Sequence, residues 1–312
     1  MIRKSLLSLL LIAIIIIGAL IIFIAKDTRQ FILIGVDGMQ YDHFTTMLST
    51  GKLPNYQRLI DNGGIATSAQ IAGHIETSTA PGNAEIFTGL PSSITTITDN
   101  SCGKSIPEGL TVFERLYGGD SSIALGLIYG KNTCYVPQSL LAHAKPIIPW
   151  WFDMNNFSPK SYISPSYADS KDISLKALEF LNLNKKNSFF LTIYYGVPDA
   201  AGHTYGENST QYDEALINTD QALGILLDWM KENDSKISMI ITSDHGWNEG
   251  TTEHSQNTTN TRTIPLLSND PSIISSPSTK YQCSIVPTLY KYFKIKSSIY
   301  TDITNTGCFS MY

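Results

Sequence analysis

The stretch Phe31-Ile32-Leu33-Ile34-Gly35-Val36-Asp37-Gly38 is a short apolar run that ends in an acidic residue and a glycine. A run that is apolar at nearly every position is typical of a central strand in a parallel sheet, where both faces are buried. Three more runs have this character and are predicted to be strands, over residues 123–129, 189–197 and 237–242. The sequence therefore predicts a sheet built largely of buried parallel strands.

Helical patterns lie between these runs, over residues 55–62, 174–183 and 211–231. Strands that alternate with helices are typical of an α/β protein, and we expect a three-layer sandwich around a mostly parallel sheet. The chain has 312 residues, of which 42% are hydrophobic and 16% charged, so it has enough apolar material for a full core. The net charge of −5 gives no indication of a nucleic-acid-binding surface.

The N-terminus is a separate segment. Residues 6–25 are apolar apart from Ser8 and Gly18, and about 20 helical residues at ~1.5 Å each span ~30 Å, the thickness of a bilayer core. A secretory signal peptide is the alternative, although its apolar region is usually roughly 7–15 residues and precedes a small-residue cleavage site. We expect residues 1–30 to form an uncleaved single-pass membrane anchor, with residues 31–312 as one extracytoplasmic domain. Cleavage would instead give a secreted protein.

Residues 131–170 are predicted to form an insertion or long loop over one end of the sheet, because the segment is rich in Pro, Trp, Tyr, Ser and Asn. Within it, Trp150-Trp151-Phe152 is either an apolar wall for a substrate or part of the core, and burial statistics favour the core.

None of the four cysteines forms a CxxC pair, so the sequence gives no support for a zinc ribbon. An even number in an exported chain permits two disulfides, and we expect Cys102–Cys134 and Cys283–Cys308, with free buried thiols as the alternative.

Three of the predicted strands are followed by an aspartate: Asp37, Asp199 and Asp244. Ligands of open parallel sheets bind outside the carboxyl ends of the strands, so these side chains should converge. A single Asp after a strand is often only a helix cap or turn former. Three such residues, two of them with a nearby histidine, favour a shared ligand site.

Asp and His side chains supply oxygen and nitrogen ligands that suit zinc, although manganese or iron accepts similar ligands. Asp199 and His203 are four residues apart, so one helical turn can present both to one ion. Asp244 and His245 are adjacent, and we expect them to point to different sides and to serve another ion or bridge a pair. His254 follows on a loop that can fold back. The remaining histidines are predicted to be surface or structural residues: His43, His74 and His143.

A candidate nucleophile lies in Thr77-Ser78-Thr79-Ala80-Pro81-Gly82-Asn83, which precedes an apolar helical stretch. Thr79 is placed as a helix N-cap, with Pro81 in the first turn, and capping alone would explain it. The helix N-terminus also favours an anion through its amides and dipole, so it could hold a Thr79 alkoxide or a phosphate.

The ordered set of motifs resembles the alkaline phosphatase superfamily, in its type I phosphodiesterase/nucleotide pyrophosphatase branch. The matching pieces span most of residues 31–254, and a later stretch is similar to the closing helix of that family. They are Val36-Asp37-Gly38, Thr77-Ser78-Thr79-Ala80-Pro81 with Thr88-Gly89-Leu90, Pro198-Asp199-Ala200-Ala201-Gly202-His203, Ser243-Asp244-His245-Gly246, His254, and Ile285-Val286-Pro287-Thr288-Leu289.

The resemblance implies a site for two divalent ions, zinc by preference, and a covalent phospho-threonine intermediate. Its ligand sets would be Asp37, Asp244 and His245 for one ion, with Thr79 as nucleophile and fourth ligand, and Asp199, His203 and His254 for the other. Two metals that clamp the attacking and leaving oxygens fit this chemistry, and covalent catalysis splits one displacement into two.

Two departures from the family pattern lie close to Thr79. Gly82 takes the place of the usual asparagine, and Asn83, which follows, either binds the substrate phosphate or caps the helix. Ala80 replaces a bulky aromatic residue, which argues against a nucleotide-specific pocket. Thr79 without a neighbouring arginine also argues against an arylsulfatase.

The sequence therefore predicts an exported, membrane-anchored, zinc-dependent phosphodiesterase acting on phosphodiester or pyrophosphate bonds. The alternatives are a phosphomonoesterase, a transferase of phospho-head groups, and an inactive binding relative. A phosphomonoesterase needs an extra positive group, which Lys104 or Lys131 would supply.

Overall fold

The computed structural model describes residues 28–72, 76–131, 141–152, 161–163, 166–274 and 281–296. The predicted membrane anchor lies almost entirely outside this part of the chain. Within it, none of the helices has the length and apolar character needed to span a bilayer.

Seven strands in the described residues form one mixed sheet in the order β2-β7-β6-β1-β5-β3-β4. Strand β7 runs antiparallel to both of its neighbours, and the other adjacent pairs are parallel. The predicted α/β fold with a mostly parallel sheet is thus confirmed. The strands are β1 Gln30–Val36, β2 Ile65–Gln70, β3 Ala124–Tyr129, β4 Trp150–Phe152, β5 Phe189–Tyr195, β6 Ser238–Thr242 and β7 Thr263–Ser268.

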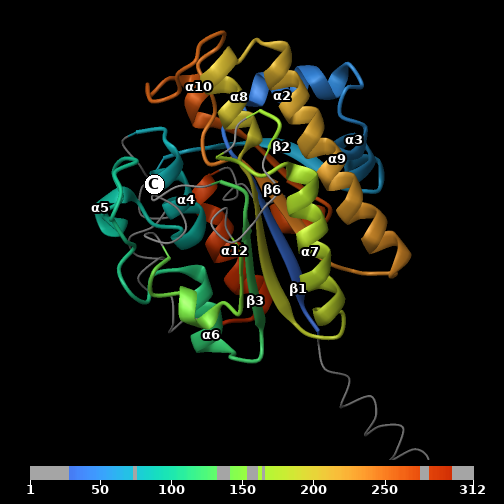
Figure 1. The fold of residues 1–312 in the computed structure, drawn as a ribbon. Helices are drawn as coiled ribbons and strands as arrows, with labels where there is room; N and C mark the ends of the chain where they lie inside the picture. The colour runs from blue at the N-terminus through green and yellow to red at the C-terminus, as the bar shows by residue number, and fades with distance from the viewer. Residues whose placement is uncertain are drawn as a thin grey trace, which may run out of the picture.

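Helices cover both faces of the sheet, which gives three layers (Figure 1). Along β1, Phe31 and Leu33 pack into one hydrophobic cluster, whereas Ile32 and Ile34 pack into the other. One cluster includes residues of α4, α6 and α12, and the other includes residues of α2, α3, α7 and α9. The longer helices are α2 Tyr41–Ser49, α3 Pro54–Asp61, α4 Thr79–Thr88, α6 Val112–Gly119, α7 Ser170–Asn184, α8 Val197–Tyr205, α9 Thr210–Glu232 and α12 Ile285–Phe293; the short ones are α5 Ser92–Thr95, α10 Thr259–Arg262 and α11 Pro271–Ile274.

The strand predicted over residues 189–197 ends earlier, at Tyr195. Gly196 is the N-cap of α8, and Pro198 occupies the first turn, where its missing N–H costs nothing. This early helix start places Asp199 in the first turn of α8 and His203 one turn later.

The segment predicted as a loop over residues 131–170 contributes β4 to the edge of the sheet. Trp150 and Phe152 pack against one hydrophobic cluster and Trp151 against the other. These aromatic residues are thus partly buried at the rim of the core, which agrees in part with the expectation that they belong to it.

Cys102 and Cys283 are disulfide-bonded. Their predicted partners, Cys134 and Cys308, lie outside the described residues, so the pairing stays a prediction.

Candidate metal centre and nucleophile

The three aspartates that follow strands meet at the carboxyl edge of the sheet, as predicted. His245 Nε2 lies 3.3 Å from Asp37 Oδ1, 3.8 Å from Asp199 Oδ1 and 3.5 Å from Asp244 Oδ2. All four side chains are buried. Asp244 and His245 therefore do not point to different sides as expected, because the chain has left the strand conformation at this point.

Asp199 also contacts two further histidines, and these three residues form a second group of possible metal ligands. His203 Nε2 and His254 Nε2 each lie 3.4 Å from Asp199 Oδ1. Among the residues that the structure describes, two groups can thus hold a metal ion: Asp199, His203 and His254, and Asp37, Asp199 and His245. His203 is exposed, so the second group lies on the open side of the site.

The orientation of the three histidine rings fits metal binding. In each ring Nδ1 donates to a backbone carbonyl: His203 to Thr252 at 3.0 Å, His245 to Gly246 at 2.9 Å and His254 to Thr77 at 2.7 Å. With the proton on Nδ1, the neutral ring presents the lone pair of Nε2 to a ligand, and such outer contacts are typical of metal-ligating histidines.

Two further observations indicate that a cation belongs here. His203 Nε2 and His254 Nε2 lie 3.1 Å apart, and two lone pairs at that distance repel unless a positive charge lies near both. Asp37 Oδ1, Asp199 Oδ1 and His245 Nε2 are buried and have no hydrogen-bond partner among the described residues. Buried polar atoms are normally satisfied, so these three fit a metal ion well.

The charges of the site shift its pKa values. Burial, together with the neighbouring Asp37 carboxylate, raises the pKa of Asp244 to about 7. Burial works to lower the pKa of His245, but the Asp244 and Asp37 carboxylates outweigh it and raise that pKa to about 9. Burial likewise opposes the ionisation of Asp199, yet the Lys131 ammonium holds the pKa of Asp199 well below its usual range. The cluster is rich in negative charge, and divalent ions would compensate it.

Thr79 is the first residue of α4, and its N-cap is Ser78, not Thr79 as predicted from the sequence. The Thr79 side chain is buried, and its Oγ1 accepts a hydrogen bond from Lys131 Nζ at 2.9 Å. Because the hydroxyl does not cap the helix, it is available for chemistry beside Asp37 and Asp199.

Asn83 lies one turn further along α4 and is fully buried. Its Nδ2 donates to Thr79 O at 2.9 Å and to Tyr194 Oη at 3.0 Å, and the Tyr194 hydroxyl donates to Asp244 Oδ2 at 2.8 Å. The structure thus gives Asn83 contacts that link α4 to Asp244. The phosphate contact stays a prediction.

The sequence interpretation left out one polar residue of the site, Asn100, and named another, Lys131, only as an alternative to Lys104 for an extra positive charge. Asn100 accepts the N–H of Ala80, the residue after Thr79, at 2.8 Å. Lys131 contacts Thr79 directly, whereas Lys104, the other lysine considered, pairs with Asp99 at 2.8 Å. Lys131 follows β3 in the same way that the aspartates follow their strands, so the same rule extended to basic residues would have found it.

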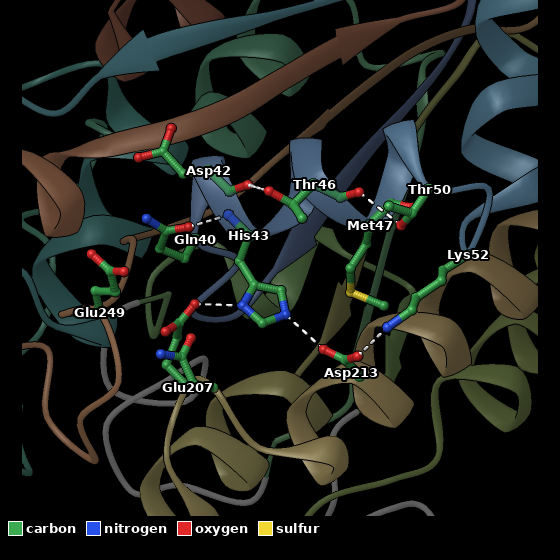
Figure 2. Close-up of a pocket in the computed structure, with 11 residues that line it drawn as sticks. Gln40, Asp42, His43, Thr46, Met47, Thr50, Lys52, Glu207, Asp213 and Glu249 are labelled. Atoms are coloured by element: carbon green, nitrogen blue, oxygen red, sulfur yellow. Dashed lines mark hydrogen bonds and ion pairs between the residues drawn. The ribbon is translucent and has the colours of Figure 1, made fainter.

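A partly buried salt-bridged cluster centres on His43 (Figure 2). His43 lies between two carboxylates, with Nδ1 2.5 Å from Glu207 Oε1 and Nε2 2.7 Å from Asp213 Oδ1. The other oxygen of Glu207 accepts the N–H of Gly250 at 2.9 Å. His43 is thus a structural residue that connects α2 to the loop of the second metal group.

The fold and this site define an alkaline phosphatase-like α/β protein with a buried threonine beside two Asp/His groups. The sequence pattern of the "Type I phosphodiesterase / nucleotide pyrophosphatase" family matches residues 122–280, half of the chain. The chain belongs to this family, as its motifs predicted.

Known proteins resemble this chain in sequence over a short stretch and in fold over most of its length. Mouse ectonucleotide pyrophosphatase/phosphodiesterase family member 1 is 35% identical over 79 residues, which are 24% of this chain and only 9% of the mouse protein. A Bacteroides thetaiotaomicron protein from glycosaminoglycan metabolism superposes with a TM-score of 0.65 at 14% identity, covering 89% of this chain and 75% of its own. A Vibrio parahaemolyticus protein of the alkaline phosphatase superfamily superposes with a TM-score of 0.54 at 16% identity. The match covers 86% of this chain and 67% of the Vibrio chain. These structural matches concern the fold alone.

Proposed function

We propose that the protein is a two-metal phosphoesterase that cleaves phosphodiester or pyrophosphate bonds through a phospho-threonine at Thr79. One observation carries the proposal: the buried Thr79 hydroxyl lies beside both groups that can hold a metal, because the ammonium it contacts also contacts Asp37 and Asp199. Membership in the phosphodiesterase/pyrophosphatase family supports a phosphoester substrate.

The proposed ligands are Asp37, Asp244, His245 and Thr79 for one ion and Asp199, His203 and His254 for the other. Zinc suits these nitrogen and oxygen donors. Ions bound there would supply positive charge that lowers the pKa of the Thr79 hydroxyl and of a water molecule, and stabilises the developing negative charge.

Thr79 acts in two displacements. In the first, its Oγ1 forms a bond to phosphorus and loses its proton to solvent, while the bond to the leaving oxygen breaks; that oxygen departs with the electron pair and takes a proton from water. In the second, a water oxygen attacks phosphorus and releases a proton. The phosphorus–Oγ1 bond then breaks, and the Thr79 oxygen regains a proton. The burial of Thr79 limits premature access of water to the first step.

We also propose that residues 1–30 anchor the chain in a membrane with the catalytic part outside the cytoplasm. The apolar run of residues 6–25 supports this location. So do the disulfides at Cys102 and Cys283, because such bonds persist in oxidising compartments. Recovery of the full chain in the alkaline-wash supernatant of membranes would contradict the anchor.

Thr79→Ala tests the function. With zinc present, we expect turnover of bis-(p-nitrophenyl) phosphate to fall by about a thousandfold or more, because the nucleophile is gone. Thr79→Ser keeps a hydroxyl and should keep a measurable rate. Mass spectrometry of acid-quenched wild-type protein should find a phosphate on Thr79. Equal turnover by the alanine variant would exclude this mechanism.

A phosphomonoesterase is the second candidate, and Lys131 beside Thr79 is the observation that favours it. A head-group transferase would form the same phospho-threonine but release it to an acceptor other than water. An inactive binding relative would show neither turnover nor labelling of Thr79.

A further inference from the structure

Lys131 brings a fixed positive charge into the site. Its side chain is 7% exposed. Its Nζ donates to Asp37 Oδ2 at 2.7 Å, Asp199 Oδ2 at 2.8 Å and Thr79 Oγ1 at 2.9 Å. An ammonium group has three N–H donors, and here each of them has an oxygen acceptor.

The surrounding chain holds Lys131 in this position. The N–H of the preceding Gly130 donates to Tyr194 O at 2.9 Å, and Lys131 pairs with Tyr167 in an isolated β-bridge. The Tyr167 ring lies 5.5 Å from Nζ, and the Tyr167 hydroxyl donates to Asp199 Oδ2 at 3.2 Å. Because the backbone and the ammonium are both fixed, the charge is a built part of the site.

Lys131 and the metal-competent groups use different oxygens of the same carboxylates. Lys131 holds Oδ2 of Asp37 and Asp199, whereas the Oδ1 atoms face the histidine Nε2 atoms and have no hydrogen-bond partner among the described residues. The ammonium therefore leaves the Oδ1 atoms available to metal ions.

We propose that Lys131 is a catalytic residue that binds the phosphoryl group attacked by Thr79 and favours groups with two negative charges, as in a phosphomonoester. The inference rests on the proposed function of Thr79. A phosphorus atom bonded to Thr79 Oγ1 brings its other oxygens within reach of the ammonium, which lies 2.9 Å from Oγ1. The N–H that Lys131 donates to Oγ1 can then turn to one of these phosphoryl oxygens, while the other two keep their carboxylate acceptors. A phosphomonoester dianion carries one more negative charge than a diester, so the same ammonium attracts it more strongly.

The test measures kcat/KM of the full chain, with zinc present, for two substrates. These are the monoester p-nitrophenyl phosphate and the diester bis-(p-nitrophenyl) phosphate. The assay is run at about pH 8, above the second pKa of a phosphate monoester near 6. Lys131→Met removes the charge and keeps much of the volume. We expect it to lower kcat/KM at least about tenfold more for the monoester than for the diester. Lys131→Arg should restore much of this ratio. Lys104→Met is the matched control, because Lys104 pairs with Asp99 and contacts none of the site residues described above, and it should leave the ratio unchanged.

A second readout needs no turnover. Calorimetry should show inorganic phosphate binding at least about tenfold more weakly to Lys131→Met, at a zinc content equal to that of the wild type. The proposal would be overturned if Lys131→Met lowered kcat/KM equally for both substrates, or if it left the affinity for inorganic phosphate unchanged. If wild-type turnover does not depend on Thr79, the proposed function fails, and the phosphate titration still decides whether Lys131 binds the anion.

Discussion

Gly82 lies where helix α4 passes close to Asp244, just after the end of β6. A Cβ atom built on Gly82 would lie 2.3 Å from the carbonyl oxygen of Asp244. This oxygen belongs to the backbone, so relieving the clash requires a shift of the main chain. We expect Gly82→Ala to lower the free energy of unfolding by about 1–3 kcal/mol, as overpacking does. It should also lower zinc content, because α4 carries Thr79 and would be pushed away from Asp244. Urea denaturation and metal analysis measure both effects.

Gly118 is the matched control for this substitution. It lies in helix α6, and a Cβ built there meets no atom within 4 Å. Gly118→Ala should leave zinc content unchanged and stabilise the protein by up to about 1 kcal/mol through helix propensity. Equal effects of the two substitutions would show that the contact with Asp244 carries no cost.

At the scale of single residues, the prediction from sequence succeeded where a simple rule applies. Asp37, Asp199 and Asp244 were found because an acid lies one or two residues after each of three predicted strands, and the structure brings them together. Lys131 was named only as a possible source of positive charge, because the strand-end rule was applied to acidic residues alone. Asn100 was missed because its contact with Ala80 joins two positions 20 residues apart in the chain. No local pattern encodes such a contact.

At the scale of elements, the His43 cluster ties helix α2 to α9 and to the loop before His254. Glu207 is buried, so removing its partner leaves a carboxylate without compensation. We expect His43→Gln to cost on the order of 2 kcal/mol and to weaken zinc binding. Lys52→Gln is the control: this exposed lysine pairs with the same Asp213, and its loss should cost less than about 1 kcal/mol.

This cluster also predicts a dependence on pH. Burial works to lower the pKa of His43, but hydrogen bonds and attraction from Glu207 and Asp213 outweigh it, and the pKa is raised. A raised pKa means that the stabilisation is complete below about pH 6.5, the unfolded value. It is lost as the pH rises through the folded value. The Tm difference between wild type and His43→Gln should therefore shrink as pH rises; a constant difference would contradict the charged pair. His43, Glu207 and Asp213 line a surface pocket, and the other charged residues that line it are Lys52, Asp42 and Glu249.

Four of the seven strands were predicted from the sequence, and the other three were not, for physical reasons. Strands β1, β3, β5 and β6 are continuous apolar runs and were predicted. Strand β7 contains Pro265, which usually argues against a strand, and β2 has the mixed composition of an edge strand. Strand β4 has only three residues, too few for a periodic signal.

At the scale of the whole molecule, metal ions should contribute to stability, because the buried carboxylates repel one another without them. Chelation should lower Tm, and zinc at about 100 times its Kd should restore about 2.7 kcal/mol per site. Asp199 belongs to both metal groups, so Asp199→Asn should lose most of this gain. A zinc-induced rise in Tm equal to that of the wild type would contradict the shared role. Scanning calorimetry measures it.

The alternation of strands and helices was enough to predict the layered α/β architecture, because burying both sheet faces requires helices on each side (Figure 1). The reversal of β7 was not predictable in the same way. Its direction depends on pairing with β2 and β6, which the chain order alone does not specify.

That reversal has a consequence for how this architecture can diversify. Since β6 ends and β7 begins at the same edge, residues 243–262 leave and re-enter the sheet without crossing it. Insertions in this segment, outside the positions of Asp244, His245 and His254, would lengthen the rim of the site and leave the sheet register intact. Residues 243–262 are thus a place where additional substrate-binding loops can be inserted without changing the candidate metal centre.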